Sequence, residues 1–521
     1  MAAHDRIQPA HFRRKIMAAE DAAALIPAGA NVGMSGFTGA GHPKAVPAAL
    51  AARVGSAALA GRRFRICVWT GASTAPDLDG VLAQVEGIDL LLPYQGDPVT
   101  RREINSGRAN YLDMHLSGVA QLAAQGLLGP LDFAVIEAVG VTADGALIPS
   151  TSVGNNRTWI DLADKVIVEI NERQSAELDG FHDIYYGTAQ PPHRMPIPVT
   201  APGDRIGVPH LVCPAEKIVA IVRTDAPDWS TAFKPPDPVF ETIAGHVIEF
   251  LRGEVASGRL PRDLLPLQSG VGNVANAVLG GLSTGPFERL TAYTEVIQDG
   301  MLQLLEAEKL VVASATALTL SQQASDTLTS RLPHYRQKII LRPQEISNHP
   351  EVIRRLGCLA MNAMLEADIY GNVNSSHVMG TAMQNGIGGS GDFTRNAYIS
   401  MFVSPSQAKG GNISCIVPMV SHIDHTEHDV NVIITEQGVA DLRGLAPKRR
   451  VRKIIDNCAH PDYRPALDDY FERALASSRG KHTPHLLNEA LSWHERYLAD
   501  GTMRQDRPRR VVSERSGHVP G

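Results

Sequence analysis

Alanine-rich helical segments alternate with short runs of β-branched residues along this chain. In the first half, residues 18–25 and 45–54 are expected to be helices, and residues 64–68, 133–139 and 165–170 buried strands. The second half repeats the pattern, with strands expected at 290–294, 311–313, 338–341, 397–402, 413–417 and 430–435. Strands separated by helices pair in parallel, so the sequence predicts an α/β fold.

The length of 521 residues is too great for one compact core and favours two domains. A proline-rich stretch between Thr224 and Pro238 suits an extended connection, which places the boundary there. The predicted domains are residues 1–225 and 239–503. The charged residues 504–521 are expected to form a mobile tail.

Composition excludes several classes of protein. A net charge of −6 with 20% charged residues gives no basic field for nucleic acid or anionic lipid. The first residues contain no apolar signal region, and no later run approaches a membrane span, so a soluble cytoplasmic protein is expected. The five cysteines stand far apart without a C-x-x-C pair, so neither a zinc site nor a disulfide framework is predicted.

Four glycines fall within six residues in the run Asn385-Gly386-Ile387-Gly388-Gly389-Ser390-Gly391-Asp392-Phe393. Such a cluster can expose backbone amides that bind an anion or stabilise an oxyanion, and a tight turn between strands explains it equally well. Two further glycine-rich loops, at 33–41 and 70–74, follow expected strands, where ligands dock in parallel sheets.

Glu295 stands at the end of the expected strand 290–294. An ionised glutamate that is shielded from water and close to amide donors can act as a nucleophile. The ordinary alternative is a surface carboxylate. A turn at 268–272 leads into an expected helix, whose first amides favour negative charge.

Longer runs carry a family resemblance from about Gly33 through His494. The most specific are residues 366–381 and 385–393, and further matches are residues 421–429, 436–438 and 456–461. These sequence segments closely resemble the acetyl-CoA hydrolase/transferase family, the branch of class I CoA-transferases that includes succinyl-CoA:acetate CoA-transferases.

The resemblance implies two CoA-transferase-type (NagB/RpiA-like) α/β domains with mostly parallel sheets, usually paired as homodimers. It also implies acyl-CoA and small carboxylic acids as substrates and a place in acetate metabolism. It implies no metal and no cofactor, since coenzyme A is a substrate.

The resemblance further assigns roles to individual residues. Glu295 matches the nucleophile that forms a glutamyl-CoA thioester, and the backbone amides of Val271 and Gly389 match the oxyanion hole. Asn348 and Glu436 match polar residues around the reacting carboxylates. Positions that match CoA contacts are Gly270, Val271, Gly272, Asn273, Val274, Leu365, Asn385, Gly389 and Lys409.

Several residues keep two interpretations. Lys409 could pair with a CoA phosphate or be a solvated loop lysine. Tyr94, Gln95 and the run Asp113-Met114-His115 could line the acid pocket or be structural. His422, His425 and His428 could suggest a metal, but polar residues flanking a strand explain them as well.

One position departs from the family pattern. Trp229 follows Pro227-Asp228 where the succinyl-CoA:acetate members would have an arginine. An indole offers one donor and no charge, which puts the preference for succinate in doubt.

Three functions follow as hypotheses. The first is an acyl-CoA:carboxylate CoA-transferase, with succinyl-CoA and acetate as the expected pair. The second is an acyl-CoA hydrolase that uses the same residues, with water intercepting the glutamyl intermediate. The third is a noncatalytic acyl-CoA-binding protein that keeps the fold.

Overall fold

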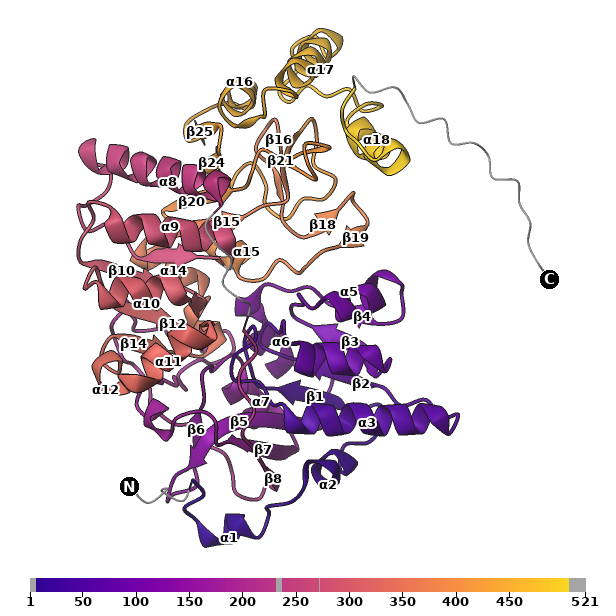
Figure 1. Ribbon diagram of the computed structural model, residues 1–521, viewed down its shortest axis with the longest axis vertical. Helices are drawn as coiled ribbons and strands as arrows, with labels where there is room; N and C mark the ends of the chain where they lie inside the picture. The colour runs from indigo at the N-terminus through magenta and orange to yellow at the C-terminus, as the bar shows by residue number, and fades with distance from the viewer. Residues whose placement is uncertain (1–5, 231–236, 271, 506–521) are drawn as a thin grey trace, which may run out of the picture.

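The computed structural model describes residues 6–230, 237–270 and 272–505. Its frame is a pair of eight-stranded sheets, one from each half of the chain. Figure 1 shows the first half in indigo and purple below the second half in magenta and orange. The expected α/β fold with mostly parallel sheets is confirmed, because only one strand in each large sheet pairs antiparallel.

The first sheet has the order β4-β3-β2-β1-β5-β7-β8, and β6 pairs with β5. Its strands are β1 (Asn31–Met34), β2 (Ile66–Trp69), β3 (Ile88–Leu92), β4 (Asn110–Tyr111), β5 (Phe133–Val141), β6 (Leu147–Pro149), β7 (Lys165–Asn171) and β8 (Ile218–Thr224). Its α-helices are α1 (Ala10–Arg13), α2 (Ala19–Ala24), α3 (Ala45–Leu59), α4 (Val81–Gln84), α5 (Pro98–Asn105), α6 (Val119–Ala124) and α7 (Asn156–Leu162). All nine residues of β5 are buried, as expected of a central strand covered on both faces.

The second sheet has the order β14-β12-β10-β9-β15-β20-β24-β25. Its strands are β9 (Leu267–Ser269), β10 (Leu290–Tyr293), β12 (Leu310–Ala315), β14 (Ile339–Leu341), β15 (Leu359–Ala363), β20 (Ile399–Val403), β24 (Val432–Thr435) and β25 (Gly438–Asp441). The α-helices around it are α8 (Pro238–Ala256), α9 (Asn273–Thr284), α10 (Asp299–Glu306), α11 (Gln322–Ser330), α12 (Leu332–Tyr335), α13 (Gln344–Ser347), α14 (Pro350–Leu356) and α15 (Ser390–Asn396).

A second core lies beside this sheet, at the top of Figure 1. It packs short strands under three helices, α16 (Pro447–Cys458), α17 (Arg464–Ser477) and α18 (Ser492–Asp500). The strands of this core are β16 (Glu366–Asp368), β17 (Val373–Asn374), β22 (Ile413–Ser414) and β23 (Ile416–Val417). The short strands β18 (His377–Val378), β19 (Ala382–Met383) and β21 (Gln407–Ala408) contribute no residue to it.

The two halves are joined by a seam of backbone hydrogen bonds. In the second half, β11 (Val296–Ile297) pairs with β13 (Ala317–Leu318), and the first-half segment 151–154 lies along β13. Val153 N–H donates to the Thr316 carbonyl over 2.9 Å, and Leu318 N–H donates to the Thr151 carbonyl over 2.9 Å. One apolar cluster continues from the first sheet into the second. The seam therefore fixes the halves against each other where β10 ends.

The first sheet ends at Thr224 and α8 begins at Pro238, on either side of the proline-rich stretch. The tail expected to be mobile lies, from residue 506 onward, outside the described residues. None of the helices in the described ranges is both long enough and apolar enough to cross a membrane.

Candidate functional site

Glu295 lies at the seam, two residues after the end of β10. Its backbone carbonyl accepts a hydrogen bond from Thr316 N–H at 2.9 Å, and Thr316 is itself held by the first half. Only 8% of the Glu295 surface is exposed, so this carboxyl is not a solvated surface group. The main chain thus sets the position of a buried carboxyl at the junction of the two halves.

The glycine cluster of the second half touches this carboxyl. A Cβ atom added at Gly389 would overlap the carboxyl group of Glu295 and crowd Asn348 Nδ2. Gly389 has φ −83° and ψ −4°, which any residue can adopt, so the requirement for glycine here is steric. The family resemblance assigned Glu295 and Gly389 to one site, and the structure brings them into contact.

The electrostatics around Glu295 oppose its charge. Burial, and to a smaller extent the neighbouring Asp392 carboxyl, outweigh a hydrogen bond from Asn348 that lowers its pKa, and the pKa is raised to about 8. Asn348 Nδ2 donates to Glu295 Oε1 across 3.5 Å. The ligand-free site therefore holds mostly protonated Glu295 at neutral pH.

Asp392 is a site residue that the sequence analysis did not single out. It is 4% exposed, and burial raises its pKa to about 6. Its carboxylate accepts from Ser117 N–H at 3.0 Å and from Ser117 Oγ at 2.5 Å, so the first half holds it. Two carboxyl groups thus share one buried site, and the Asp392 carboxylate favours the neutral form of Glu295.

Side chains of the first half hold the glycine cluster in place. The Ile387 amide donates to both carboxylate oxygens of Asp113, at 3.1 and 2.9 Å. A Cβ atom at Gly386 would meet Tyr111 and Asp113, and one at Gly391 would meet the His115 ring. The glycines are needed because the loop packs directly against the other half, so the alternative of a simple turn between strands does not account for them.

A cavity of about 420 Å³ opens above Glu295 and is lined by both halves. The first half contributes loops after β1 and β2, which include Phe37, Thr38 and Ala72, as well as Tyr94 and Arg101. The sequence predicted that these two glycine-rich loops stand at the carboxyl ends of strands, where ligands dock. The second half contributes Gly270, residues 362–365 and residues 385–390.

The predicted CoA-contacting residues divide into two groups. Gly270, Leu365, Asn385 and Gly389 line the cavity. Lys409 does not; it is exposed in the turn between β21 and β22, with a positive φ of 51°. Gly272, exposed with φ 131°, precedes α9, and Val274 is buried in the first turn of that helix.

One further predicted residue, Glu436, lies away from the cavity. Glu436 follows β24 and does not line the cavity; its carboxylate accepts from Ser406 N–H at 2.8 Å and from Gln437 Nε2 at 3.0 Å. Val271, one of the two predicted oxyanion donors, lies outside the described residues, as does the side chain of Asn273, although its backbone begins α9.

Trp229 forms part of the cavity wall. Its amide donates to the Gly39 carbonyl at 3.0 Å, and the preceding Asp228 accepts from Lys44 Nζ at 2.7 Å. The side chain is 38% exposed. The residue that departs from the family pattern is therefore held at the cavity, where it presents an uncharged ring.

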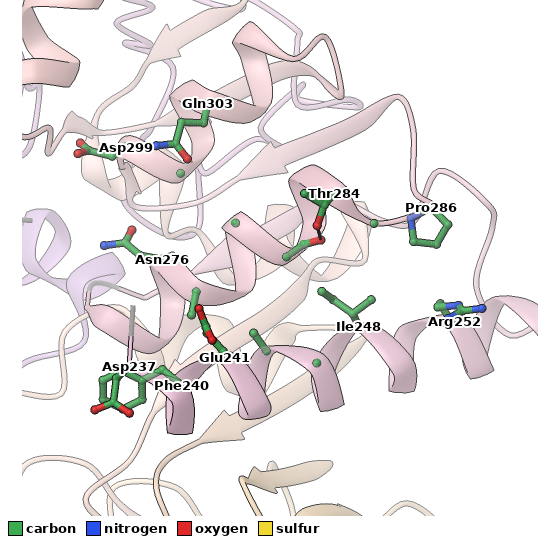
Figure 2. A pocket seen from close by; sticks show the side chains of 17 residues that line it. Asp237, Phe240, Glu241, Ile248, Arg252, Asn276, Thr284, Pro286, Asp299 and Gln303 are labelled. Carbon is green, nitrogen blue, oxygen red and sulfur yellow. Dashed lines mark hydrogen bonds between the residues drawn. The ribbon is translucent and has the colours of Figure 1, made fainter. Parts of the chain in front are cut away.

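A larger cavity of about 660 Å³ lies on the outer helices of the second half and shares no lining residue with the Glu295 cavity. Figure 2 shows it as a groove over α9, with side chains of α8 on one side and Asp299 and Gln303 of α10 on the other. Size alone would favour this groove. The smaller cavity is the better candidate because it alone contains Glu295 and Gly389.

Comparison with known proteins identifies the family of the chain. The chain matches the models of the acetyl-CoA hydrolase/transferase N-terminal domain over residues 1–227 and C-terminal domain over residues 325–471. It is 50% identical to the succinyl-CoA:acetate CoA-transferase of Clostridium kluyveri, covering 96% of this chain and 92% of that protein. It is 45% identical to an acetyl-CoA hydrolase of Schizosaccharomyces pombe, covering 96% and 98%. A propanoyl-CoA:succinate CoA transferase of Escherichia coli is 44% identical, covering 94% and 98%.

Solved structures agree in fold. RipA from Yersinia pestis matches with a TM-score of 0.68 at 22% identity, covering 89% of this chain and 98% of its own. The 4-hydroxybutyrate CoA-transferase from Porphyromonas gingivalis matches with a TM-score of 0.60 at 20% identity, covering 89% and 98%. On the family models and the relatives over nearly its whole length, the chain belongs to the acetyl-CoA hydrolase/transferase family.

Proposed function

We propose that this protein is an acyl-CoA:carboxylate CoA-transferase that works through a glutamyl-CoA thioester on Glu295. The observation that carries the proposal is the buried carboxyl of Glu295, pressed against the Gly389 backbone at the base of a cavity built by both halves. The relatives named as CoA-transferases supply the substrate pair, succinyl-CoA and acetate.

The reaction divides into balanced steps. Ionised Glu295 attacks the thioester carbonyl, and the carbon–sulfur bond breaks. CoA thiolate departs, and a mixed acyl-glutamyl anhydride remains on the protein. The thiolate then attacks the glutamyl carbonyl, which releases the first carboxylate and leaves glutamyl-CoA. A second carboxylate attacks that thioester and reverses the sequence, so Glu295 is regenerated.

The residues of the site fit roles in these steps. The Gly389 backbone lies against the Glu295 carboxyl, and its amide is assigned as a donor to the oxyanion formed there. Asn348 favours the ionised nucleophile, while burial and Asp392 disfavour it. A nucleophile with a pKa of about 8 is about one-tenth ionised at pH 7, and an ionised carboxylate in a dry site is strongly nucleophilic.

Acyl-CoA hydrolysis is the second candidate, because the 45% identical yeast relative is named an acetyl-CoA hydrolase. Water would then attack glutamyl-CoA in place of a carboxylate. CoA release from acyl-CoA, measured with and without acetate, separates the two reactions. Release that requires the acceptor supports the transferase, and a rate indifferent to acetate contradicts it.

A covalent test addresses the intermediate. After incubation with acyl-CoA, intact-mass analysis should find CoA attached to the protein, and borohydride should reduce that adduct at Glu295. The variant Glu295→Gln should form no adduct, whereas the exposed control Glu249→Gln should form it normally. Wild-type protein that binds acyl-CoA but stays unmodified would support the noncatalytic alternative.

The proposal includes the homodimer that the family resemblance implies. Light scattering during gel filtration measures the mass of the particle directly. A particle with the mass of one chain would contradict the dimer and leave the chemistry of the site unaffected.

A further inference from the structure

Arg101 is the only Lys, Arg or His side chain among the described residues that line the Glu295 cavity. It belongs to α5 in the first half, which Asp97 caps by accepting from the Val99 and Thr100 amides at 2.9 and 2.8 Å. The capped helix gives Arg101 a fixed backbone position. A cation therefore stands at the wall of a cavity whose base holds the proposed nucleophile.

The guanidinium of Arg101 has few hydrogen-bond partners among the described residues. Nη2 donates to the Gly96 carbonyl at 3.2 Å, whereas Nε is buried and has no hydrogen-bond partner among the described residues. Buried donors without partners are rare in folded proteins, and a bound ligand is one way to satisfy them. No carboxylate of the described chain forms an ion pair with Arg101, so its charge is available to an anionic substrate.

Tyr94 lies close enough to both Arg101 and the Glu295 carboxyl for each to affect its pKa. Its pKa is raised to about 12 by burial, by Asp113 and by Glu295, and Arg101 acts in the opposite direction. Tyr94 thus lies within the electrostatic range of both Arg101 and Glu295, and it packs at 3.3 Å from the position of a Cβ atom on Gly388. Trp229 in the same wall adds no charge.

We propose that Arg101 binds the distal carboxylate of dicarboxylic substrates and so sets a preference for succinyl over acetyl groups. The inference rests on the proposed function and names the substrate class of that same site. One carboxylate of a dicarboxylate must approach the glutamyl thioester, which leaves the second to be bound by another charge. A guanidinium suits that second carboxylate because its planar fork can donate two parallel hydrogen bonds. Acetate has no group to place there.

The test compares Arg101→Gln and Arg101→Lys with Arg102→Gln, a matched control one residue along the same helix, whose side chain is exposed. Loss of a hydrogen-bonded charge contact predicts that Arg101→Gln lowers kcat/KM with succinyl-CoA about 10- to 100-fold relative to the value with acetyl-CoA. The loss should fall mainly on the KM for succinyl-CoA. Arg101→Lys should recover part of the ratio because it keeps the charge, and Arg102→Gln should leave the ratio unchanged.

Two outcomes overturn the inference. An equal loss with succinyl-CoA and acetyl-CoA would mean that Arg101 serves a part common to both, such as a CoA phosphate, or the fold. An unchanged ratio in Arg101→Gln would mean that the residue binds no substrate carboxylate. Circular dichroism of each variant excludes misfolding, and Arg101→Lys supplies a second reading if the glutamine variant does not fold.

Direct binding separates this inference from the proposed function. Succinate and acetate are titrated calorimetrically into the wild type and Arg101→Gln, without any turnover. Weaker binding of succinate alone in the variant supports the role of Arg101 even if no CoA transfer is observed, whereas equal succinate affinities overturn it. Acceptor-independent CoA release in the wild type would contradict the proposed function only.

Discussion

Replacing Glu295 by glutamine should stabilise the ligand-free protein, and should do so more strongly as the pH rises. Glutamine has nearly the same shape and keeps an oxygen that can accept the bond from Asn348. It removes only the charge that the buried site disfavours. The expected result is thus an enzyme that loses activity and gains stability, which is typical of a residue strained by its function.

The size of the effect follows from the pKa of Glu295, about 8 in the folded chain against 4.5 for an ordinary glutamate. Between these values the folded chain keeps a proton that the unfolded chain has lost, so the stability of the wild type falls as the pH rises. At about 1.36 kcal/mol for each pKa unit, the charge costs about 2 kcal/mol at pH 6 and about 4 kcal/mol at pH 8. Above pH 8 the cost is constant, and below pH 4.5 it vanishes.

The measurement is the unfolding temperature of both proteins by scanning calorimetry at several pH values between 5 and 9. The difference between Glu295→Gln and the wild type should widen through this range and level off above pH 8. The control is Glu249→Gln, which removes an exposed carboxylate paired with Arg252 at 3.1 Å. Such a pair contributes less than about 1 kcal/mol, so this control should show no comparable trend.

Two results would refute the reasoning. A difference that does not change with pH would show that Glu295 has an ordinary pKa in the folded protein. A variant less stable than the wild type at pH 8 would show that the ionised carboxylate is well solvated or paired, contrary to its burial. Either result would also remove the electrostatic basis of the proposed nucleophile.

Three other substitutions test the surroundings of this carboxyl. Gly389→Ala keeps the backbone amide but adds a methyl group that would displace the Glu295 carboxyl, so the fold should persist and kcat should fall about 100-fold, as a misplaced reacting group does. Gly253→Ala, which has open space around it, is the control, and normal turnover in the Gly389 variant would contradict the contact. Asn348→Ala removes a bond that lowers the pKa of Glu295, so kcat/KM should fall more at pH 7 than at pH 9, and an unshifted pH profile would speak against this role. Asp113→Ala removes the charge-assisted hydrogen bonds that hold the Ile387 amide, each of which contributes about 1.5 to 3 kcal/mol. Hydrogen exchange at the amides of residues 386–391 should therefore become faster, and activity should fall. Unchanged exchange would show that packing alone holds the loop.

The sequence predicted the fold because its strands are long enough to show their pattern. The runs at 133–139 and 165–170 became β5 and β7, since continuous apolar text is typical of a strand buried on both faces. The second core around α16 to α18 was not predicted, although the strand expected at 413–417 corresponds to its short strands β22 and β23. Most of its strands have two residues, which is too short for any periodicity to be read.

The site was predicted in part. Glu295 and Gly389 could be named from their own sequence surroundings, and they are in contact. Asp392 and Arg101 could not, because their importance arises only where the halves meet: Ser117 fixes one, and the other reaches the cavity from α5. Lys409 and Glu436 match family positions but lie away from the cavity in this structure. The amino-acid sequence alone does not show which loops the seam between the halves brings together.

The backbone ladder between residues 151–154 and 316–318 has a consequence for how the gene could be divided. Because the union of the halves depends on these bonds and on a shared apolar cluster, the covalent connection between Trp229 and Pro238 adds mainly proximity. Two separately made fragments should therefore find each other and rebuild the catalytic centre. The same architecture could be encoded as two polypeptides without redesigning a single contact of the active centre.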